Sequence, residues 1–271
     1  TRPPLRPPSP NGGPPQAPGT ATRPIVAFGK PPAASGHRVL LYGPGGIGKT
    51  SLASLAPDRV VFIDLEDSLA KLKLDADVVP GVETWDQLRS ALQSDGWAGV
   101  NTIVIDSATR AEELAVANTL ANVLVDGKRS TSVEGYGYGK GYGFVFDTFL
   151  PLLQDLDRHT RAGRNVILIC HDCTATVPNP NGEDWLRYEP RLQSPTSGKA
   201  SIRLRVREWA DHVLFVGYDG AVDKEGKGKG GGSRTIYPTE TPSAMAKSRT
   251  CREPMVFQEG TEKDIWAAVI N

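Results

Sequence analysis

The chain has 271 residues, 39% of them hydrophobic and 23% charged, and its 31 basic residues equal its 31 acidic ones. This is the composition of an ordinary globular protein, and no apolar run approaches the roughly 18 residues of a spanning helix, which excludes an integral membrane protein. Three cysteines are too few for a disulfide framework and the first residues lack a signal core, so we expect a cytoplasmic protein. The balanced charge provides no overall positive field, so any binding of nucleic acid would need a local basic patch.

The first 35 residues form a compositionally separate region. They contain 11 of the 22 prolines, four basic residues and no acidic residue. Such a segment buries too little apolar surface to offset the entropy of ordering, so we expect a disordered or polyproline-like tail over residues 1–35. The tail is either a passive extension or a tether for a partner. Residues 36–271 then form one domain with a net charge of −4.

From residue 38 onward, short β-branched runs alternate with stretches of helical periodicity. The pattern predicts strands over 39–42, 60–64, 102–106 and 166–170, and helices over 49–55, 85–93, 108–123 and 144–159. Strands that alternate with helices favour an α/β fold with a parallel sheet covered on both faces. Further along we predict a helix over 199–207, strands over 213–218 and 235–237 around a flexible Gly- and Lys-rich loop at 224–233, and a closing helix over 262–270.

The first predicted strand leads into a glycine-rich motif. Its residues are Gly43-Pro44-Gly45-Gly46-Ile47-Gly48-Lys49-Thr50, followed by Ser51, and they match G-x-x-x-x-G-K-[ST] at every fixed position. Glycines let backbone N–H groups surround phosphates, and the following helix adds a favourable dipole. We expect Lys49 to reach the β- and γ-phosphates and the Thr50 hydroxyl to bind Mg²⁺. The motif therefore predicts a nucleotide-binding protein.

Two later strands end in carboxylates. Asp106 ends the run 102–106, where a carboxylate binds Mg²⁺ through water. The strand 60–64 lies between this run and the glycine-rich motif, and an additional strand in that place is typical of ATPases whose sheet carries a catalytic glutamate. We expect Glu66 to orient and deprotonate the attacking water, with ATP and Mg²⁺ as cofactors. Asp64 and Asp67 are alternatives for this role, as is a solvated acidic turn without catalytic function.

These strand ends resemble those of RecA-type recombinases. The resemblance lies in Phe62-Ile63-Asp64-Leu65-Glu66-Asp67 and in Ile103-Val104-Ile105-Asp106-Ser107. It implies that the glutamate is the catalytic base. The run Val166-Ile167-Leu168-Ile169-Cys170-His171 is similar to the strand that ends in a γ-phosphate sensor, a glutamine in RecA. By this resemblance His171 senses the γ-phosphate; the alternative is a structural histidine.

Residues 36–260 as a whole resemble the phage RecA-like single-strand annealing proteins, the Sak group of AAA-family ATPases. Lys140-Gly141-Tyr142-Gly143 and Trp209-Ala210-Asp211 add to the motifs above. The resemblance implies a RecA-like P-loop NTPase fold, with a mostly parallel sheet, helices on both faces and antiparallel C-terminal strands. It further implies an ATPase that binds single-stranded DNA and promotes annealing or strand exchange in phage recombination, in the host cytoplasm. A single-strand binding protein is the implied accessory partner.

Two segments are candidates for binding DNA, because in RecA-type proteins the loops after these strands do so. Segment 126–143 alternates glycine with tyrosine, and Tyr136, Tyr138 and Tyr142, with Lys140 among them, would stack on unpaired bases. The alternative is a surface loop whose tyrosines pack on the domain. Segment 172–199 and the helix after it contain the aromatic and basic candidates Trp185, Arg187, Arg191, Lys199 and Arg203. Residues 187–207 have a local net charge of +5, which favours a phosphate-binding surface over an unpartnered charged helix.

A last motif concerns assembly. Lys247-Ser248-Arg249 is similar to the Lys-x-Arg finger of RecA-like hexameric helicases, which reaches the γ-phosphate of a neighbouring subunit. By this resemblance Lys247 and Arg249 act in trans, and the active form is a homo-oligomeric ring or filament with nucleotide at subunit interfaces. Other interpretations remain open: an ATP-gated DNA clamp with little turnover, a ring helicase, or a small-molecule kinase.

Overall fold

The computed structural model describes residues 28–29, 35–196, 199–222 and 228–270. Nearly all of the predicted tail over residues 1–35 lies outside these described residues. The described residues from 35 to 270 form one compact unit. Its helices are α1 Lys49–Ser54, α2 Leu69–Leu72, α3 Trp85–Gln93, α4 Ala108–Asn122, α5 Lys140–Arg161, α6 Ile202–Trp209 and α7 Glu262–Ile270, with a 3₁₀ turn at Glu134–Tyr136. Every helix among the described residues is too short or too polar to cross a bilayer.

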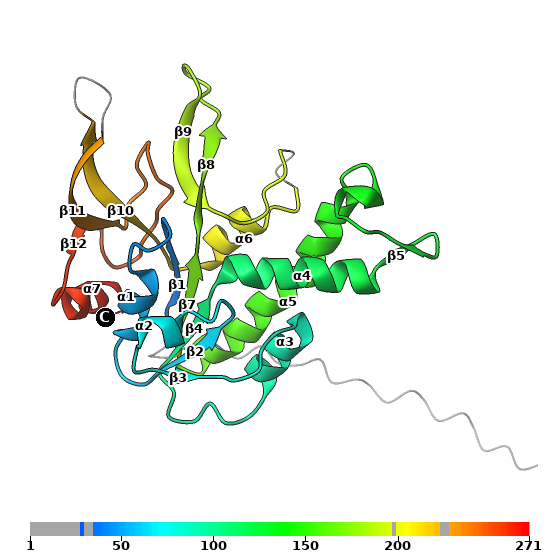
Figure 1. Ribbon diagram of the computed structural model, residues 1–271, viewed down its shortest axis with the longest axis horizontal. Helices are drawn as coiled ribbons and strands as arrows, with labels where there is room; N and C mark the ends of the chain where they lie inside the picture. The colour runs from blue at the N-terminus through cyan, green and yellow to red at the C-terminus, as the bar shows by residue number, and fades with distance from the viewer. Residues whose placement is uncertain (1–27, 30–34, 197–198, 223–227, 271) are drawn as a thin grey trace, which may run out of the picture. The chain divides into compact units, whose positions relative to one another are not determined.

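An eight-stranded sheet forms the centre of the unit, in the order β12-β11-β10-β1-β7-β4-β2-β3 (Figure 1). These strands are β1 Arg38–Tyr42, β2 Val60–Asp64, β3 Asp77–Val78, β4 Thr102–Asp106, β7 Asn165–Cys170, β10 His212–Val222, β11 Gly228–Tyr237 and β12 Met255–Phe257. The pairs from β10 to β3 are parallel, and β11 and β12 are added antiparallel. This arrangement confirms the predicted α/β P-loop NTPase fold, including its antiparallel C-terminal strands.

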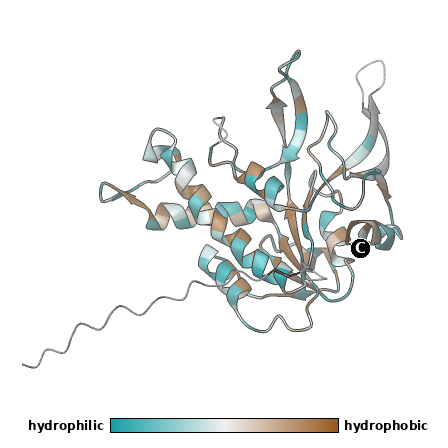
Figure 2. Cartoon of the chain, turned by 180° about the vertical axis from the view of Figure 1, so that it is seen from behind, coloured by the Kyte–Doolittle hydropathy of each residue, from teal (hydrophilic) through white to brown (hydrophobic). Residues whose placement is uncertain are grey.

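The strands are apolar on both faces because helices cover both sides of the sheet. In β1, Leu40 and Tyr42 join the core with α3, α4, α5 and α6, while Val39 and Leu41 join the core with α1, α2 and α7. Figure 2 shows the hydrophobic strands between helices that carry hydrophilic segments. Because the strands from β10 to β3 run parallel, their carboxyl ends all meet at one edge of the sheet, which is where ligands bind in open α/β sheets.

The first predicted DNA segment is more structured than the sequence indicated. Residues 126–143 include β6 Lys128–Arg129, which pairs with β5 Leu124–Val125, then the 3₁₀ turn and the beginning of α5. Helix α5 begins at Lys140 rather than at the predicted 144, after Gly139 in the left-handed conformation. Gly141 fits into the first turn because its backbone approaches Val133 closely: a Cβ there would lie 2.0 Å from the Val133 carbonyl oxygen. The glycines therefore permit close packing in this part of the segment.

Two further loops are corrected by the structure. Segment 172–199 contains a two-stranded hairpin of β8 Asp172–Val177 and β9 Trp185–Pro190, which extends from the body (Figure 1). The helix expected over 199–207 is α6, which begins at Ile202 where the Ser201 side chain accepts a bond from Leu204 N. Of the loop expected over 224–233, residues 224–227 lie outside the described part of the chain, and the rest is strand from Gly228 onward, paired with β10. Its glycines are accommodated because antiparallel pairing needs only backbone groups.

Candidate functional site

The glycine-rich motif forms a phosphate-binding loop between β1 and α1. Gly43 is required at the start, since a Cβ there would lie 2.3 Å from the Val216 carbonyl oxygen on β10. Lys49 is buried, and its Nζ donates to the carbonyl oxygens of Gly43 at 2.7 Å and Pro44 at 2.8 Å. Burial lowers the pKa of Lys49. The loop carbonyls thus hold this ammonium group at the centre of the loop.

Thr50 and Asp106 meet at the carboxyl edge of the sheet. The Thr50 hydroxyl donates to Asp106 Oδ2 at 2.7 Å, and the Ser68 hydroxyl donates to the same oxygen at 3.1 Å. Asp106 is the last residue of β4 and is 3% exposed, and this burial raises its pKa. Hydroxyl and carboxylate oxygens in contact are the ligand set that suits Mg²⁺. The two residues predicted to bind metal are therefore adjacent.

Glu66 points into the same site from the turn after β2. Its carboxylate accepts hydrogen bonds from the Ser107 hydroxyl and from His171, whose Nε2 lies 3.1 Å from Glu66 Oε1 and 3.3 Å from Oε2. The bond from His171 is the main cause that lowers the pKa of Glu66 to about 2, with Ser107 and Lys49 contributing. Since the carboxylate is ionised and can only accept, His171 donates from Nε2.

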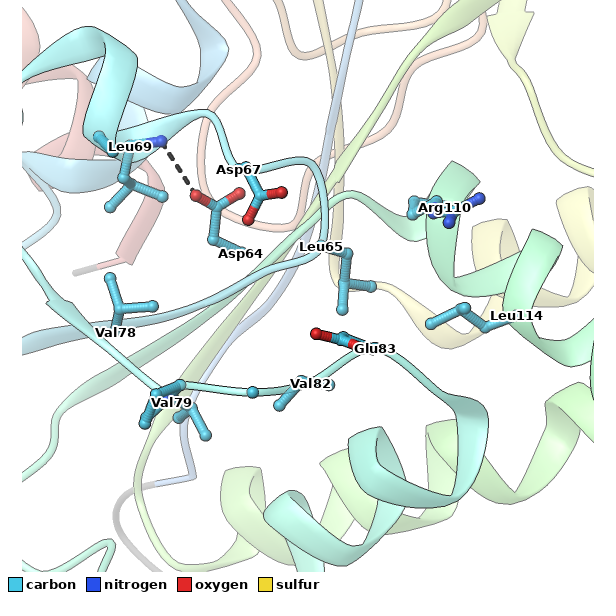
Figure 3. A pocket seen from close by; sticks show the side chains of 13 residues that line it. Asp64, Leu65, Asp67, Leu69, Val78, Val79, Val82, Glu83, Arg110 and Leu114 are labelled. Atoms are coloured by element: carbon cyan, nitrogen blue, oxygen red, sulfur yellow. Dashed lines mark hydrogen bonds between the residues drawn. The ribbon is translucent and has the colours of Figure 1, made fainter.

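The other two carboxylates of this turn lie elsewhere. Asp64 accepts bonds from the backbone N–H groups of Ser68 and Leu69, so it stabilises the turn before α2. Figure 3 shows Asp64 and Asp67 at a separate pocket of about 620 Å³, which Leu65 and Arg110 also line. Of the three carboxylates considered from the sequence, Glu66 is the one that lines the phosphate-loop cavity.

A cavity of about 500 Å³ joins these groups. It is lined by residues 45, 46 and 48–51 of the loop and by Glu66, Asp106 and His171. Five further lining residues were not predicted as site residues: Ser68, Lys71, Leu72, Ile169 and Arg234. Ser68 and Lys71 follow Glu66 closely in the sequence, and this proximity could have identified them as candidates for the site. Arg234 lies on β11, and no motif marked it.

Comparison with known families agrees with this geometry. The profile of the AAA domain family matches residues 35–250, which is most of the chain. The chain belongs to the AAA domain family. A search of curated proteins found none that matches. The chain therefore contains an AAA-family P-loop ATPase domain. The matched residues include every element from the phosphate-binding loop to the Lys-x-Arg motif.

The tyrosines of the first predicted DNA segment separate into two groups. Tyr136 is 8% exposed and its hydroxyl donates to the carbonyl oxygens of Thr119 and Val123, which corrects the expectation of an exposed stacking face at this residue. Tyr138 is fully exposed, and the half-buried Tyr142 donates to Glu134. Lys140 is exposed at the beginning of α5. For Tyr136, the structure therefore agrees with the alternative interpretation, in which the tyrosine packs on the domain.

The second predicted DNA segment contains buried ion pairs. Arg187 and Arg203 are each about one-tenth exposed, and both bind the buried Glu189. Glu240 binds Arg187 and Arg207 from 53 and 33 residues further along the chain. This pairing corrects the expected +5 phosphate-binding patch at Arg187, Arg203 and Arg207, which already have carboxylate partners. Exposed side chains of this segment include Trp185, Arg191 and Lys199.

The Lys-x-Arg motif pairs with the beginning of β10, at the end of the parallel strands opposite to the phosphate-binding loop. Lys247 Nζ donates to the carbonyl oxygen of Arg207 at 2.7 Å at the end of α6, and its backbone pairs with Val213. Arg249 forms an ion pair of 2.8 Å with Asp211 and remains largely exposed. A function of these two residues in a neighbouring subunit stays a prediction.

Proposed function

We propose that this AAA domain binds ATP with Mg²⁺, hydrolyses the γ-phosphate and uses this cycle to handle single-stranded DNA during annealing or strand exchange. The observation that carries the proposal is the contact between Glu66 and His171 beside Lys49 and Asp106. Through this contact Glu66, which is placed for hydrolysis, bonds to His171, the residue directly before the β8–β9 hairpin.

The proposed binding of ATP rests on the phosphate-binding loop and on two residues with oxygen atoms suited to Mg²⁺, Thr50 and Asp106. Lys49 exchanges its bonds to the loop carbonyls for the β- and γ-phosphate oxygens, as P-loop lysines do. Thr50 and Asp106 would hold Mg²⁺, Asp106 through water. When bound, Mg²⁺ neutralises negative charge on the β- and γ-phosphates.

The catalytic base in this proposal is Glu66. A carboxylate with a pKa of about 2 accepts a proton poorly. If His171 turns from Glu66 to the γ-phosphate, Glu66 loses the bond that most lowers its pKa and becomes a better base for the attacking water. His171 would then be both the γ-phosphate sensor and the group that restrains Glu66 before ATP binds.

Single-stranded DNA is the proposed partner of the hairpin side. Trp185 is 36% and Leu186 66% exposed on β9, and Arg191 and Lys199 are exposed after it. Aromatic faces with nearby cations suit unpaired bases and their phosphates. Tyr138 and Lys140 offer a second such pair of groups. The proposal includes a homo-oligomer in which Lys247 and Arg249 reach a neighbouring site, an accessory single-strand binding protein, and a role in phage recombination in the host cytoplasm.

The decisive experiment is ATP hydrolysis with and without single-stranded DNA, with Lys49→Ala as the blank. We expect turnover that DNA stimulates, that Glu66→Gln abolishes with ATP binding retained, and that Lys49→Ala removes together with binding. Turnover of Lys49→Ala at the wild-type rate would refute the site. Turnover indifferent to DNA would refute the proposed partner, and bound ATP without turnover would favour the ATP-gated clamp.

A further inference from the structure

Arg234 reaches the phosphate-binding loop from a strand that is distant in sequence. It lies on β11, where its partners are Tyr218 on β10 and Phe257 on β12. Its Nη1 donates to the carbonyl oxygen of Ile47 at 2.9 Å, across 187 residues of chain. Gly48 makes this approach possible, since a Cβ there would lie 2.5 Å from Nη1. The loop and the strand therefore fit each other through a glycine.

The guanidinium group is held in place on two sides. Its carbon lies 4.0 Å from the centroid of the Phe257 ring, which is 3% exposed. The bond to Ile47 fixes a second direction. A side chain with long rotatable segments is thus fixed before any ligand binds, which lowers the entropy lost on binding. Arg234 also lines the 500 Å³ cavity together with Lys49 and Glu66.

We propose that Arg234 is a phosphate-binding residue of this site, contributed in cis by β11. The inference rests on the proposed binding of ATP and adds a residue to it. A guanidinium stacked on a ring keeps its planar edge of N–H donors available, and these donors match the oxygens of a phosphate. The cavity contains the carboxylates of Glu66 and Asp106, so the positive charge of Arg234 would add to that of Lys49, Lys71 and the proposed Mg²⁺ in attracting a triphosphate.

The position of Arg234 also differs from that of the Lys-x-Arg motif. Lys247 binds the end of α6 and Arg249 binds Asp211, both away from this cavity. Arg234 already lies at the loop within a single chain. In this proposal the contribution of Arg234 to the affinity for the triphosphate does not depend on a second copy of the chain.

The test measures displacement of a fluorescent ATP analogue by ATP and by inorganic tripolyphosphate, which carries phosphates without base or ribose. For Arg234→Ala we expect both affinities to fall by about tenfold or more, by the same factor. Arg234→Lys, which keeps the charge, should recover part of the loss. The exposed Arg252→Ala is the matched control and should change neither affinity.

Other outcomes would overturn the inference. Unchanged affinities in Arg234→Ala would mean that the residue only supports the loop, and a loss for ATP with none for tripolyphosphate would mean that it contacts base or ribose. Arg234→Gln, which keeps a polar side chain without the charge, repeats the test if the alanine variant fails to fold. A wild-type chain that binds neither compound would instead refute the proposed function.

Discussion

The bond between His171 and Glu66 allows a quantitative test of the site. The pKa of Glu66 is about 2 against its usual 4.5, and the hydrogen bond from His171 is the largest cause. A shift of this size corresponds to at most about 3 kcal/mol, shared among several groups. The two side chains are 29% and 31% exposed, so solvent screens their interaction. We expect a coupling energy of about 1 kcal/mol between them.

A double-mutant cycle measures this coupling. Urea unfolding of the wild type, His171→Ala, Glu66→Gln and the double variant at pH 7 should give about 1 kcal/mol of non-additivity. Because the folded pKa of Glu66 is depressed, its contribution is present above pH 4.5 and is lost as the pH falls toward 2. The coupling should therefore shrink over that range. His159→Ala, far from Glu66, should be additive with Glu66→Gln, and additivity of the His171 pair at pH 7 would refute the reasoning.

Three further predictions concern buried polar groups. Burial raises the pKa of Glu112 to about 7 from its usual 4.5, so the free energy of unfolding of the wild type falls as the pH rises between these values. In Glu112→Gln, the difference between the free energies of unfolding in urea at pH 5 and at pH 8 should be smaller by about 2 kcal/mol. Tyr42→Phe should destabilise by about 1–2 kcal/mol, since two carbonyl oxygens lose their donor, whereas exposed Tyr218→Phe should be neutral by thermal unfolding. Arg203→Ala should cost about 3 kcal/mol in the same assay by leaving a buried carboxylate half-paired, and an equal effect of exposed Arg205→Ala would contradict this.

The central elements could be predicted because burial on both faces leaves a strong pattern. Strands 60–64 and 102–106 and helices 85–93 and 262–270 have the bounds expected from sequence. The hairpin of β8 and β9 was missed because Glu189 and Pro190 are the only buried residues of its two strands, which therefore lack a continuous apolar face. Its register depends on backbone pairing, which composition does not reveal.

Site residues in short local motifs could be predicted from the sequence, whereas those that depend on contacts between distant segments could not. Lys49, Thr50 and Asp106 could be predicted because short motifs with known chemistry surround them. The net charge summed along 187–207 could not show that Glu189 lies between Arg187 and Arg203, or that Glu240 binds Arg187 and Arg207. Arg234 escaped notice for the same reason: its partner Ile47 lies 187 residues away.

The β8–β9 hairpin is attached to the phosphate-binding site at both of its ends. Its first strand follows His171 directly, and the carbonyl oxygen of Tyr188 near its end accepts a bond of 3.0 Å from Tyr42, the residue before Gly43. The Tyr188 ring also stacks on Phe215, which contacts Tyr42. A change at the γ-phosphate would therefore act on the hairpin through His171, while the buried Tyr42 contact holds the other strand. The two ends are also bonded to each other, because Asp172 pairs with Pro190 and Arg191 N donates to the His171 carbonyl oxygen at 2.8 Å. In the proposed function, a displacement of His171 would therefore be transmitted to both strands and so to the exposed Trp185.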